Sequence, residues 1–297
     1  MKILALDIGG TEIKSVMFDE NGQVGEVMRT PSRNEKESSI FVNGAAVTKM
    51  YSGYDCVAVS ATGQIDTAKN TLLFSYGTPS DAEGLNYPIG EIIEAAAGKP
   101  AFVLNDSNAA TLAESRFGAG KDYDSLVCIT YGTGVGGGIV LGRELFLGTR
   151  GIAGEVGHLP IHAGSDRVCG CGHNGCYESY ASTTALLRMA REIIPELKNG
   201  RELFALADGD ERLQTVISKW VDEIVEGLCA LCYMFNPPCI VLGGGVMEQP
   251  RLIPMIRERF KARIIPTFSK VDIVPAKLGN MAGLYGAYAY VMSRLGM

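Results

Sequence analysis

The sequence lacks the features that would mark a membrane, secreted or nucleic-acid-binding protein. No run of about 18 apolar residues occurs among its 297 residues, so we expect no membrane-spanning helix. Lys and Arg number 27 against 33 Asp and Glu, and the net charge of −6 argues against a surface built to offset phosphates. The opening residues MKILALDIGG lack the apolar length and the cleavage site of a signal peptide, so we expect a cytoplasmic protein.

Disulfides are also not expected, although the chain has eight cysteines, because a reducing compartment keeps thiols free. Five cysteines lie singly in or beside apolar segments and are interpreted as small buried hydrophobes: Cys56, Cys128, Cys229, Cys232 and Cys239. The other three fall within CGCGHNGCYES at 169–179, and this segment needs a different explanation.

The remaining composition is ordinary for a globular protein, with 46% hydrophobic and 20% charged residues, and the length suffices for two domains. Strand-like and helix-like segments alternate, which indicates an α/β fold. Apolar runs predict strands at KILALDI, EIKSVMFD, CVAVSA, AFVLND and CIVLGGGV, with a third early strand after the turn at 20–22. Periodic patterns predict helices at 39–50, 89–97, 214–235 and about 281–295, and one that Ser107 and Asn108 cap and that reaches about Phe117.

Part of the pattern occurs twice. SLVCITYGTGVGGGIVLGRELFLG repeats the layout of LALDIGGTEIKSVMFDENGQVGEV: apolar strand, glycine turn, second strand, second tight turn. Such internal similarity predicts two related lobes. We expect one lobe at 1–117, with the C-terminal helix 281–297 packing back on it, and the other at 118–280, with a hinge near 118–120.

Three glycine-rich turns each follow an expected strand, at 7–11, 130–134 and 242–245. Such a turn can point successive backbone N–H groups at one anion, because no Cβ blocks close approach. A single example is more often only a turn, whereas three in one chain indicate phosphate binding. The first turn leads into a strand, unlike a Rossmann fingerprint, and no Gly-Lys-Ser/Thr follows as in a P-loop.

Two such hairpins facing each other across a cleft could hold the β- and γ-phosphates of a nucleotide, and the third turn would then lie against the adenosine. Asp7 suits a place near Mg²⁺, reached through water, although it could also simply cap the turn at the strand end.

DIGGT, GTGVGGG and LGGGV, in this order, resemble the phosphate and adenosine elements of the hexokinase–actin ATPase superfamily. LNDSNAAT, EVGH and CGCGHNGCYES narrow the resemblance to the ROK family of bacterial sugar kinases and repressors, over essentially the whole chain. The resemblance implies a two-lobed, actin-like (ribonuclease H-like) α/β fold with duplicated mixed sheets, a cleft that closes, and a homodimer. It also implies that ATP and Mg²⁺ contact Asp7, Ile8, Gly9, Gly10, Thr11, Lys14, Thr130, Gly132, Thr133, Gly134, Gly136, Gly243, Gly244 and Gly245.

Asn105 and Asp106 lie where a short strand meets a helix N-terminus. Phosphoryl transfer to an alcohol needs a carboxylate that accepts the hydroxyl proton, and a short Asp side chain on a rigid strand end suits that task. Asp is equally a favoured helix cap, so the residues alone leave both interpretations open. The ROK resemblance implies that Asp106 is the catalytic base and that Asn105 binds a sugar hydroxyl, with Ser107 where the family often has Ala.

Cys169, Cys171 and Cys176, together with one imidazole, would make a Cys₃His site, which is typical of structural zinc. Redox-active or idle thiols are the alternative, but the spacings C-x-C and C-x₄-C differ from the redox motif C-x-x-C. The spacing does not choose the fourth ligand among the three histidines, which are His158, His162 and His173.

The resemblance implies that His158 of the EVGH motif is this ligand, with its second ring nitrogen facing the sugar. It also places Glu155, Glu178 and Gly63 against the sugar, where the carboxylates would accept hydrogen bonds from hydroxyl groups. The cysteine run would then end on a glutamate because the metal loop carries Glu178 into the pocket.

The activity implied is ATP-dependent phosphorylation of the 6-hydroxyl of a hexose or hexoside. A ROK repressor would carry an N-terminal winged helix-turn-helix, and here the first strand starts at Lys2. A sugar sensor without catalysis is the other alternative, but Asp106 and all three turns are intact. The segment 60–95 lacks the Pro-Gly and Asn-Leu-x-x-Trp signatures of glucokinases, and the loop at 86–88 and the chain length resemble those of the family's β-glucoside and N-acetylmannosamine kinases. The resemblance implies a β-glucoside such as cellobiose as substrate, with glucose or N-acetylmannosamine as alternatives.

Overall fold

A computed structural model describes residues 1–19, 21–34, 39–75 and 85–297. Strands and helices alternate along the chain, so the α/β prediction is confirmed. Two predicted features, the turn at 20–22 and the segment 60–95, lie partly outside the described residues, at residue 20 and at 76–84. Within the described ranges, no helix has both the length and the apolarity needed to cross a bilayer.

The chain divides into two compact units. The first contains Met1–Lys121, Glu144–Gly154 and Asn280–Met297, and the second contains Asp122–Arg143 and Glu155–Gly279. The C-terminal helix therefore packs within the first unit. Residues 144–154 also lie there, although the sequence analysis grouped them with the second lobe.

The first unit is built on a mixed sheet with the strand order β3-β2-β1-β4-β7. β1 is antiparallel to β2 and parallel to β4, and β4 is parallel to β7. The strands are β1 Ile3–Ile8, β2 Glu12–Phe18, β3 Met28–Pro31, β4 Cys56–Ala61 and β7 Ala101–Asn105, and a separate hairpin joins β5 Gln64–Asp66 to β6 Thr71–Phe74.

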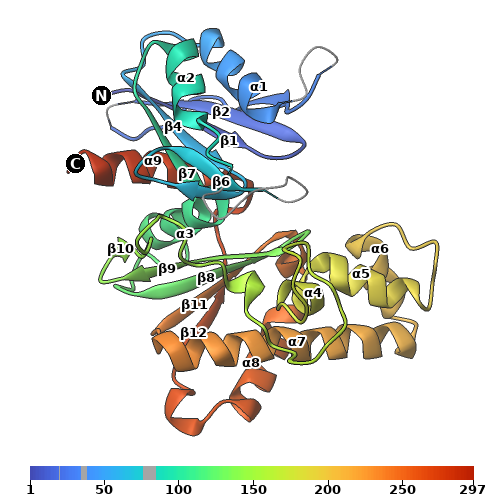
Figure 1. Cartoon of the computed structure of the whole chain (residues 1–297). Coiled ribbons are helices and arrows are strands. Elements are labelled where there is room, and N and C mark those ends of the chain that lie inside the picture. The colour runs from blue at the N-terminus through green and yellow to red at the C-terminus, as the bar shows by residue number, and fades with distance from the viewer. Residues whose placement is uncertain (20, 35–38, 76–84) are drawn as a thin grey trace. The chain divides into compact units, whose positions relative to one another are not determined.

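Helices cover both faces of this sheet because successive side chains of a strand point to opposite faces. Leu4 and Leu6 of β1 pack into a core with α1 and α2, whereas Ile3 and Ala5 pack into a core with α9 (Figure 1). The helices are α1 Ile40–Val47, α2 Ile89–Ala97, α3 Asp106–Arg116 and α9 Ala282–Arg294, and the short 3₁₀ helix η1, Thr48–Met50, extends α1.

The second unit repeats this topology. Its order β9-β8-β11-β12 matches β2-β1-β4-β7, again with one antiparallel and two parallel pairings. The duplicated mixed sheets predicted from the repeated turns are therefore confirmed. The strands are β8 Leu126–Tyr131, β9 Val135–Leu141, β11 Cys239–Gly243 and β12 Asp272–Pro275, while β10 Glu144–Leu145 falls in the residues grouped with the first unit.

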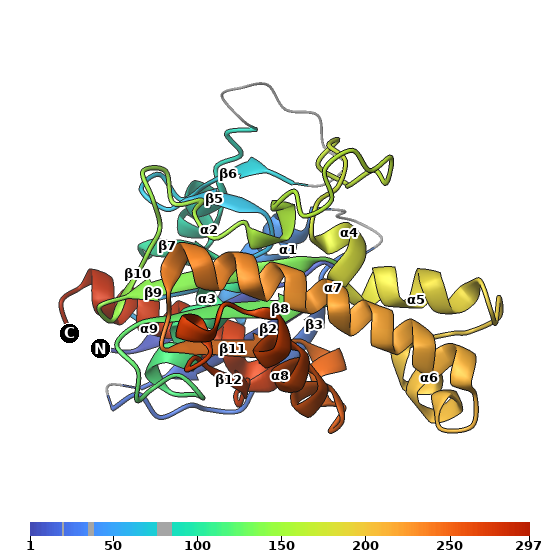
Figure 2. The same cartoon turned by 90° about the horizontal axis from the view of Figure 1, so that it is seen from below.

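The long helix α7, Glu211–Phe235, is the main support of the second unit, and the helices α4, α5, α6 and α8 pack on it (Figure 2). It begins three residues earlier than predicted because the Asp210 side chain caps the Arg212 N–H. It ends at Asn236, before two prolines. The other α-helices are α4 Glu178–Ala181, α5 Thr183–Arg191, α6 Gly200–Ala207 and α8 Leu252–Arg263. The short 3₁₀ helices are η2 Val156–His158, η3 Gly245–Glu248, η4 Pro266–Phe268 and η5 Gly279–Met281.

Candidate functional site

In the first unit, Asp7 stands beside the glycine turn that joins β1 to β2. Its register partners are Lys14 on β2 and Ser60 on β4. Lys14 Nζ lies 3.1 Å from Asp7 Oδ2, and the Ser60 hydroxyl donates to Oδ1 at 2.8 Å. Gly283 of α9 approaches the same carboxylate, since a Cβ there would lie 2.5 Å from Oδ1. The carboxylate is thus fixed by two donors and leaves no room for a side chain on α9.

Ser60 and Gly283 were missed by the sequence analysis. Ser60 is fully buried in the otherwise apolar run CVAVSA, and a buried hydroxyl needs a partner, so this serine was a usable signal. Gly283 gave no signal, because α9 meets β1 only in the folded chain.

The first glycine turn would contact a ligand mainly through its backbone groups and less through side chains. Gly9 N–H donates to Glu12 O at 3.1 Å, and Ser32 donates to Gly9 O at 2.6 Å, which closes the turn. Gly10 and Thr11 are exposed. Ile8, in contrast, packs its side chain in the core with α1, so only its backbone could meet a ligand.

Asp106 is the first residue of α3 and keeps part of its surface accessible. Its Oδ1 accepts from the Ser107 N–H at 2.7 Å and from Asn105 Nδ2 at 3.1 Å, and the Ser107 hydroxyl lies at 3.3 Å. Desolvation by the surrounding protein, aided by the charge on Asp7, raises the pKa of Asp106 to about 6, against the opposing effect of the Ser107 N–H. This carboxyl group is therefore mostly ionised at pH 7.

The cap of α3 differs from the prediction. Asn105, and not Ser107 or Asn108, is the N-cap: its side-chain oxygen accepts from the N–H groups of Ser107 and Asn108, both at 3.0 Å. The prediction was wrong because Asn105 has the extended backbone of a cap, with φ −60° and ψ 145°. Asn105 Nδ2 also donates to Gly63 O at 2.9 Å and to Asp106. The Asn105 amide therefore holds Gly63 and Asp106 in place.

In the second unit, two glycine turns lie side by side at the ends of parallel strands. β8 and β11 pair so that Thr130 is the register partner of Gly243, and Thr130 also pairs with Gly136 on β9. The second turn, Gly132–Gly134, is closed by a hydrogen bond from Gly132 N–H to Gly134 O at 3.0 Å. The third turn, Gly243–Gly245, leads into η3. The predicted phosphate and adenosine turns of this unit are thus neighbours.

Glu178 reaches this hairpin from the start of α4. Its Oε2 accepts from Val135 N–H at 3.4 Å, and a Cβ on Gly134 would lie 2.5 Å from the same oxygen. Its Oε1 accepts from the Cys169 thiol at 2.9 Å. One carboxylate therefore contacts both the second glycine turn and the cysteine segment.

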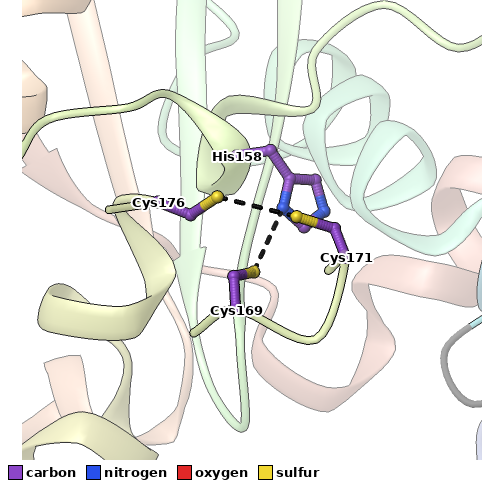
Figure 3. Close-up of side chains that lie close together, drawn as sticks. All are labelled: His158, Cys169, Cys171 and Cys176. Atoms are coloured by element: carbon purple, nitrogen blue, oxygen red, sulfur yellow. Dashed lines mark hydrogen bonds between the residues drawn. The ribbon is translucent and has the colours of Figure 1, made fainter. Parts of the chain in front are cut away.

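The predicted metal residues converge in the same unit. The ligand atoms of His158, Cys169, Cys171 and Cys176 all lie within 4.8 Å of one another, and Figure 3 shows the side chains pointing together. The sulfur atoms of Cys171 and Cys176 are 3.6 Å apart, as are Cys169 Sγ and His158 Nδ1. A tetrahedral zinc ion with bonds of about 2.3 Å to sulfur holds its sulfurs about 3.8 Å apart, so the donor set and spacing fit zinc.

His158 presents its two ring nitrogens to different neighbours. Nδ1 faces the sulfur atoms, while Nε2 lies 3.8 Å from Glu155 Oε2, across the single turn η2. The other two histidines lie apart from the cluster: His173 is exposed, and His162 pairs with Glu223 at 2.6 Å.

Comparison with known proteins identifies the family of the chain. Residues 3–294 match the ROK family. The chain belongs to the ROK family. Among its ROK relatives, a glucokinase from Streptomyces coelicolor is 33% identical over 307 residues, which cover 96% of this chain and 95% of that protein. An N-acetylmannosamine kinase from Haemophilus influenzae is 32% identical over 295 residues, covering 98% and 95%.

A solved ROK structure shares the fold. The ROK family glucokinase from Streptomyces griseus, in complex with glucose and AMPPNP, superposes with a TM-score of 0.83 at 31% identity, and the match covers 99% of this chain and 100% of that one. The predicted actin-like ATPase fold of the ROK hexokinases is therefore confirmed.

Proposed function

We propose that this chain is an ATP-dependent sugar kinase that phosphorylates the 6-hydroxyl of a hexose or hexoside. Its membership of the ROK family and the sugar kinases among its relatives support this activity. The observation that carries the proposal is Asp106, an ionised carboxylate held on one oxygen by Asn105 and Ser107. Among the described residues, no donor is bound to its Oδ2, which is thus the atom to receive a proton.

Asp106 acts as the base. Its Oδ2 takes the proton of the sugar 6-hydroxyl while that oxygen attacks the γ-phosphorus of ATP, and the bond from this phosphorus to the β,γ-bridging oxygen breaks to release ADP. A pKa of about 6 suits this role, because the group is ionised at neutral pH yet basic enough to accept a proton.

The glycine turns bind the nucleotide. The backbone of Gly9, Gly10 and Thr11 and that of Gly132–Gly134 hold the phosphates, and Gly243–Gly245 lies against the adenosine. Asp7 is the carboxylate nearest the first turn, and Mg²⁺ is usually held by one or two carboxylates together with substrate phosphates. When bound there, Mg²⁺ would offset charge on the phosphates. Lys14, which now pairs with Asp7, supplies a further positive charge.

The second unit supplies the sugar contacts. Glu155 and Glu178 accept hydrogen bonds from sugar hydroxyls, and His158 Nε2 adds a third polar contact. Zinc held by His158 Nδ1 and the three thiolates would have a structural task, fixing the imidazole ring and the loop that leads into Glu178.

The β-glucoside specificity predicted from 60–95 remains a prediction. The relatives named above are a glucokinase and an N-acetylmannosamine kinase, so glucose and N-acetylmannosamine are equally to be tried. Rates on cellobiose, glucose and N-acetylmannosamine, measured side by side with the same enzyme, choose among the three.

A coupled assay of ADP release tests the activity itself. We expect sugar-dependent ADP formation with at least one sugar of that panel and a sugar 6-phosphate as product. A protein that binds sugar and nucleotide but never releases ADP would instead be a sensor. Light scattering on the purified chain checks the homodimer that the family resemblance predicts.

A further inference from the structure

Two fully buried tyrosines connect parts of the second unit to which the proposed mechanism assigns different ligands. Tyr131 is the last residue of β8, directly before the second glycine turn. Tyr177 stands between the metal residue Cys176 and the sugar residue Glu178. Both side chains have 0% exposure, and their hydroxyl oxygens are 2.7 Å apart.

The direction of these hydrogen bonds is fixed by a count of protons. The Tyr177 hydroxyl donates to Ile224 O on α7 at 2.9 Å, and it has only one proton. Tyr131 must therefore donate to Tyr177. The chain of hydrogen bonds from Tyr131 to Tyr177 to Ile224 O is therefore complete.

Further contacts join the same two segments. Thr183 N–H donates to Gly132 O at 2.9 Å, and its hydroxyl donates to Tyr131 O at 3.4 Å. Glu178 accepts from Val135 N–H on the far side of the turn. The glycine turn is thus bound to the segment 176–183 at both of its ends.

The surroundings leave this pair little freedom. The Tyr131 ring packs edge-on against Tyr177 at 6.3 Å and against Trp220 at 6.5 Å between centroids. Trp220 Nε1 donates to Ala181 O at 2.9 Å, at the end of α4. On α7, Gly227 faces the Tyr177 ring so closely that a Cβ would overlap it. A movement of the glycine turn should therefore move Glu178, and a movement of Glu178 should move the turn.

We propose that Tyr131 and Tyr177 are positioning residues that make the second glycine turn and the Glu178 segment one body, so that nucleotide and sugar strengthen each other's binding. A nucleotide that orders the turn also orders Glu178. The sugar then binds at a smaller cost in conformational entropy. The inference rests on the proposed function, which assigns phosphate to the turn and sugar to Glu178.

Tyr131→Phe is the variant that tests it, because it removes the hydrogen bond between the two tyrosines without stranding a buried donor: Tyr177 still donates to Ile224 O. The matched control is Tyr54→Phe, which removes another buried tyrosine hydroxyl, one that donates to Thr48 O at 3.3 Å in the first unit. The affinity for the sugar chosen by the panel is measured by calorimetry, alone and with a saturating non-hydrolysable ATP analogue and Mg²⁺.

We expect wild type and Tyr54→Phe to bind sugar several-fold more tightly with the analogue than without it. In Tyr131→Phe this ratio should fall toward one, since a net hydrogen bond is worth about the several-fold coupling expected of wild type, while the affinity for sugar alone changes by less than about twofold. Trp220 is the only tryptophan, so its emission shows directly whether each variant keeps the packing around residue 131.

An unchanged ratio in Tyr131→Phe would overturn the proposal, as would a wild-type ratio of one. If Tyr131→Phe does not fold, the double variant Tyr131→Phe/Tyr177→Phe replaces it, because removing both hydroxyls leaves neither tyrosine as a buried donor without an acceptor, and the same loss of ratio is expected. Failure of the proposed function looks different, since wild type would then phosphorylate no sugar.

Discussion

At the scale of single residues, Asp106 owes its chemistry to its neighbours. Burial and the nearby charge of Asp7 weaken its acidity, while donors from Asn105 and Ser107 keep it ionised at neutral pH. The hydrogen bonds from Asn105 and Ser107 also fix the direction of the carboxyl group. If Asp106 is the base, its pKa should therefore set the pH dependence of the reaction as well as the rate of turnover.

The first prediction concerns the pH profile. Only the ionised form of Asp106 can accept a proton, and its pKa is raised from 3.8 to about 6. kcat/KM should therefore be level above pH 7 and fall about tenfold per pH unit below about 6. Ser107→Ala removes a donor to the carboxylate, so its midpoint should move to higher pH. A profile that stays level down to pH 4.5 would contradict the base assignment.

The second prediction concerns Gly134. A Cβ there would lie 2.5 Å from Glu178 Oε2, the far end of a flexible side chain, so Gly134→Ala should displace the carboxylate without unfolding the protein. We expect the KM for sugar to rise roughly tenfold, as for loss of a hydrogen bond to a charged group, with little change in melting temperature. Gly132→Ala is the matched control, because nothing lies within 4 Å of its Cβ position. An equal rise in both variants would show that the hairpin, and not Glu178, is affected.

At the scale of elements, the apolar runs predicted the strands well, because buried parallel strands are continuous stretches of Ile, Val, Leu and Ala. Helix starts were less predictable. The cap of α3 is Asn105 and that of α7 is Asp210, and each depends on backbone angles that the residue types alone do not fix.

The metal loop supports the third prediction. Cys169, Cys171, Cys176 and His158 fit one zinc ion, and Glu178 follows directly on the same loop. Elemental analysis should find about one zinc per chain. Chelation should weaken sugar binding before nucleotide binding, because the metal residues hold the loop that carries Glu178, which the proposed function assigns to the sugar. Cys239→Ser is the control for general thiol loss, because it removes a buried cysteine far from the cluster in sequence and should leave the zinc content unchanged. Simultaneous loss of both affinities would indicate unfolding instead.

At the scale of the whole molecule, duplication was visible in the sequence because each glycine turn follows the same kind of apolar strand. Both sheets indeed repeat one strand order. The contacts that prepare the site were not visible. Ser60 meets Asp7 across 53 residues, and Tyr131 meets Tyr177 across 46, and no local pattern encodes such pairings. The metal ligands were predictable because three of the four lie within eight residues.

The most direct test of the account is turnover by Asp106→Asn, compared with sugar and nucleotide affinities of the same variant. Asparagine keeps the shape and removes the base, so we expect kcat to fall by about 10²-fold or more while both affinities stay within a few-fold of wild type. The variant should also unfold at a higher temperature at pH 7, since a carboxyl group whose pKa burial raises is destabilising once ionised. A variant that folds, binds both ligands and keeps most of its turnover would contradict the account.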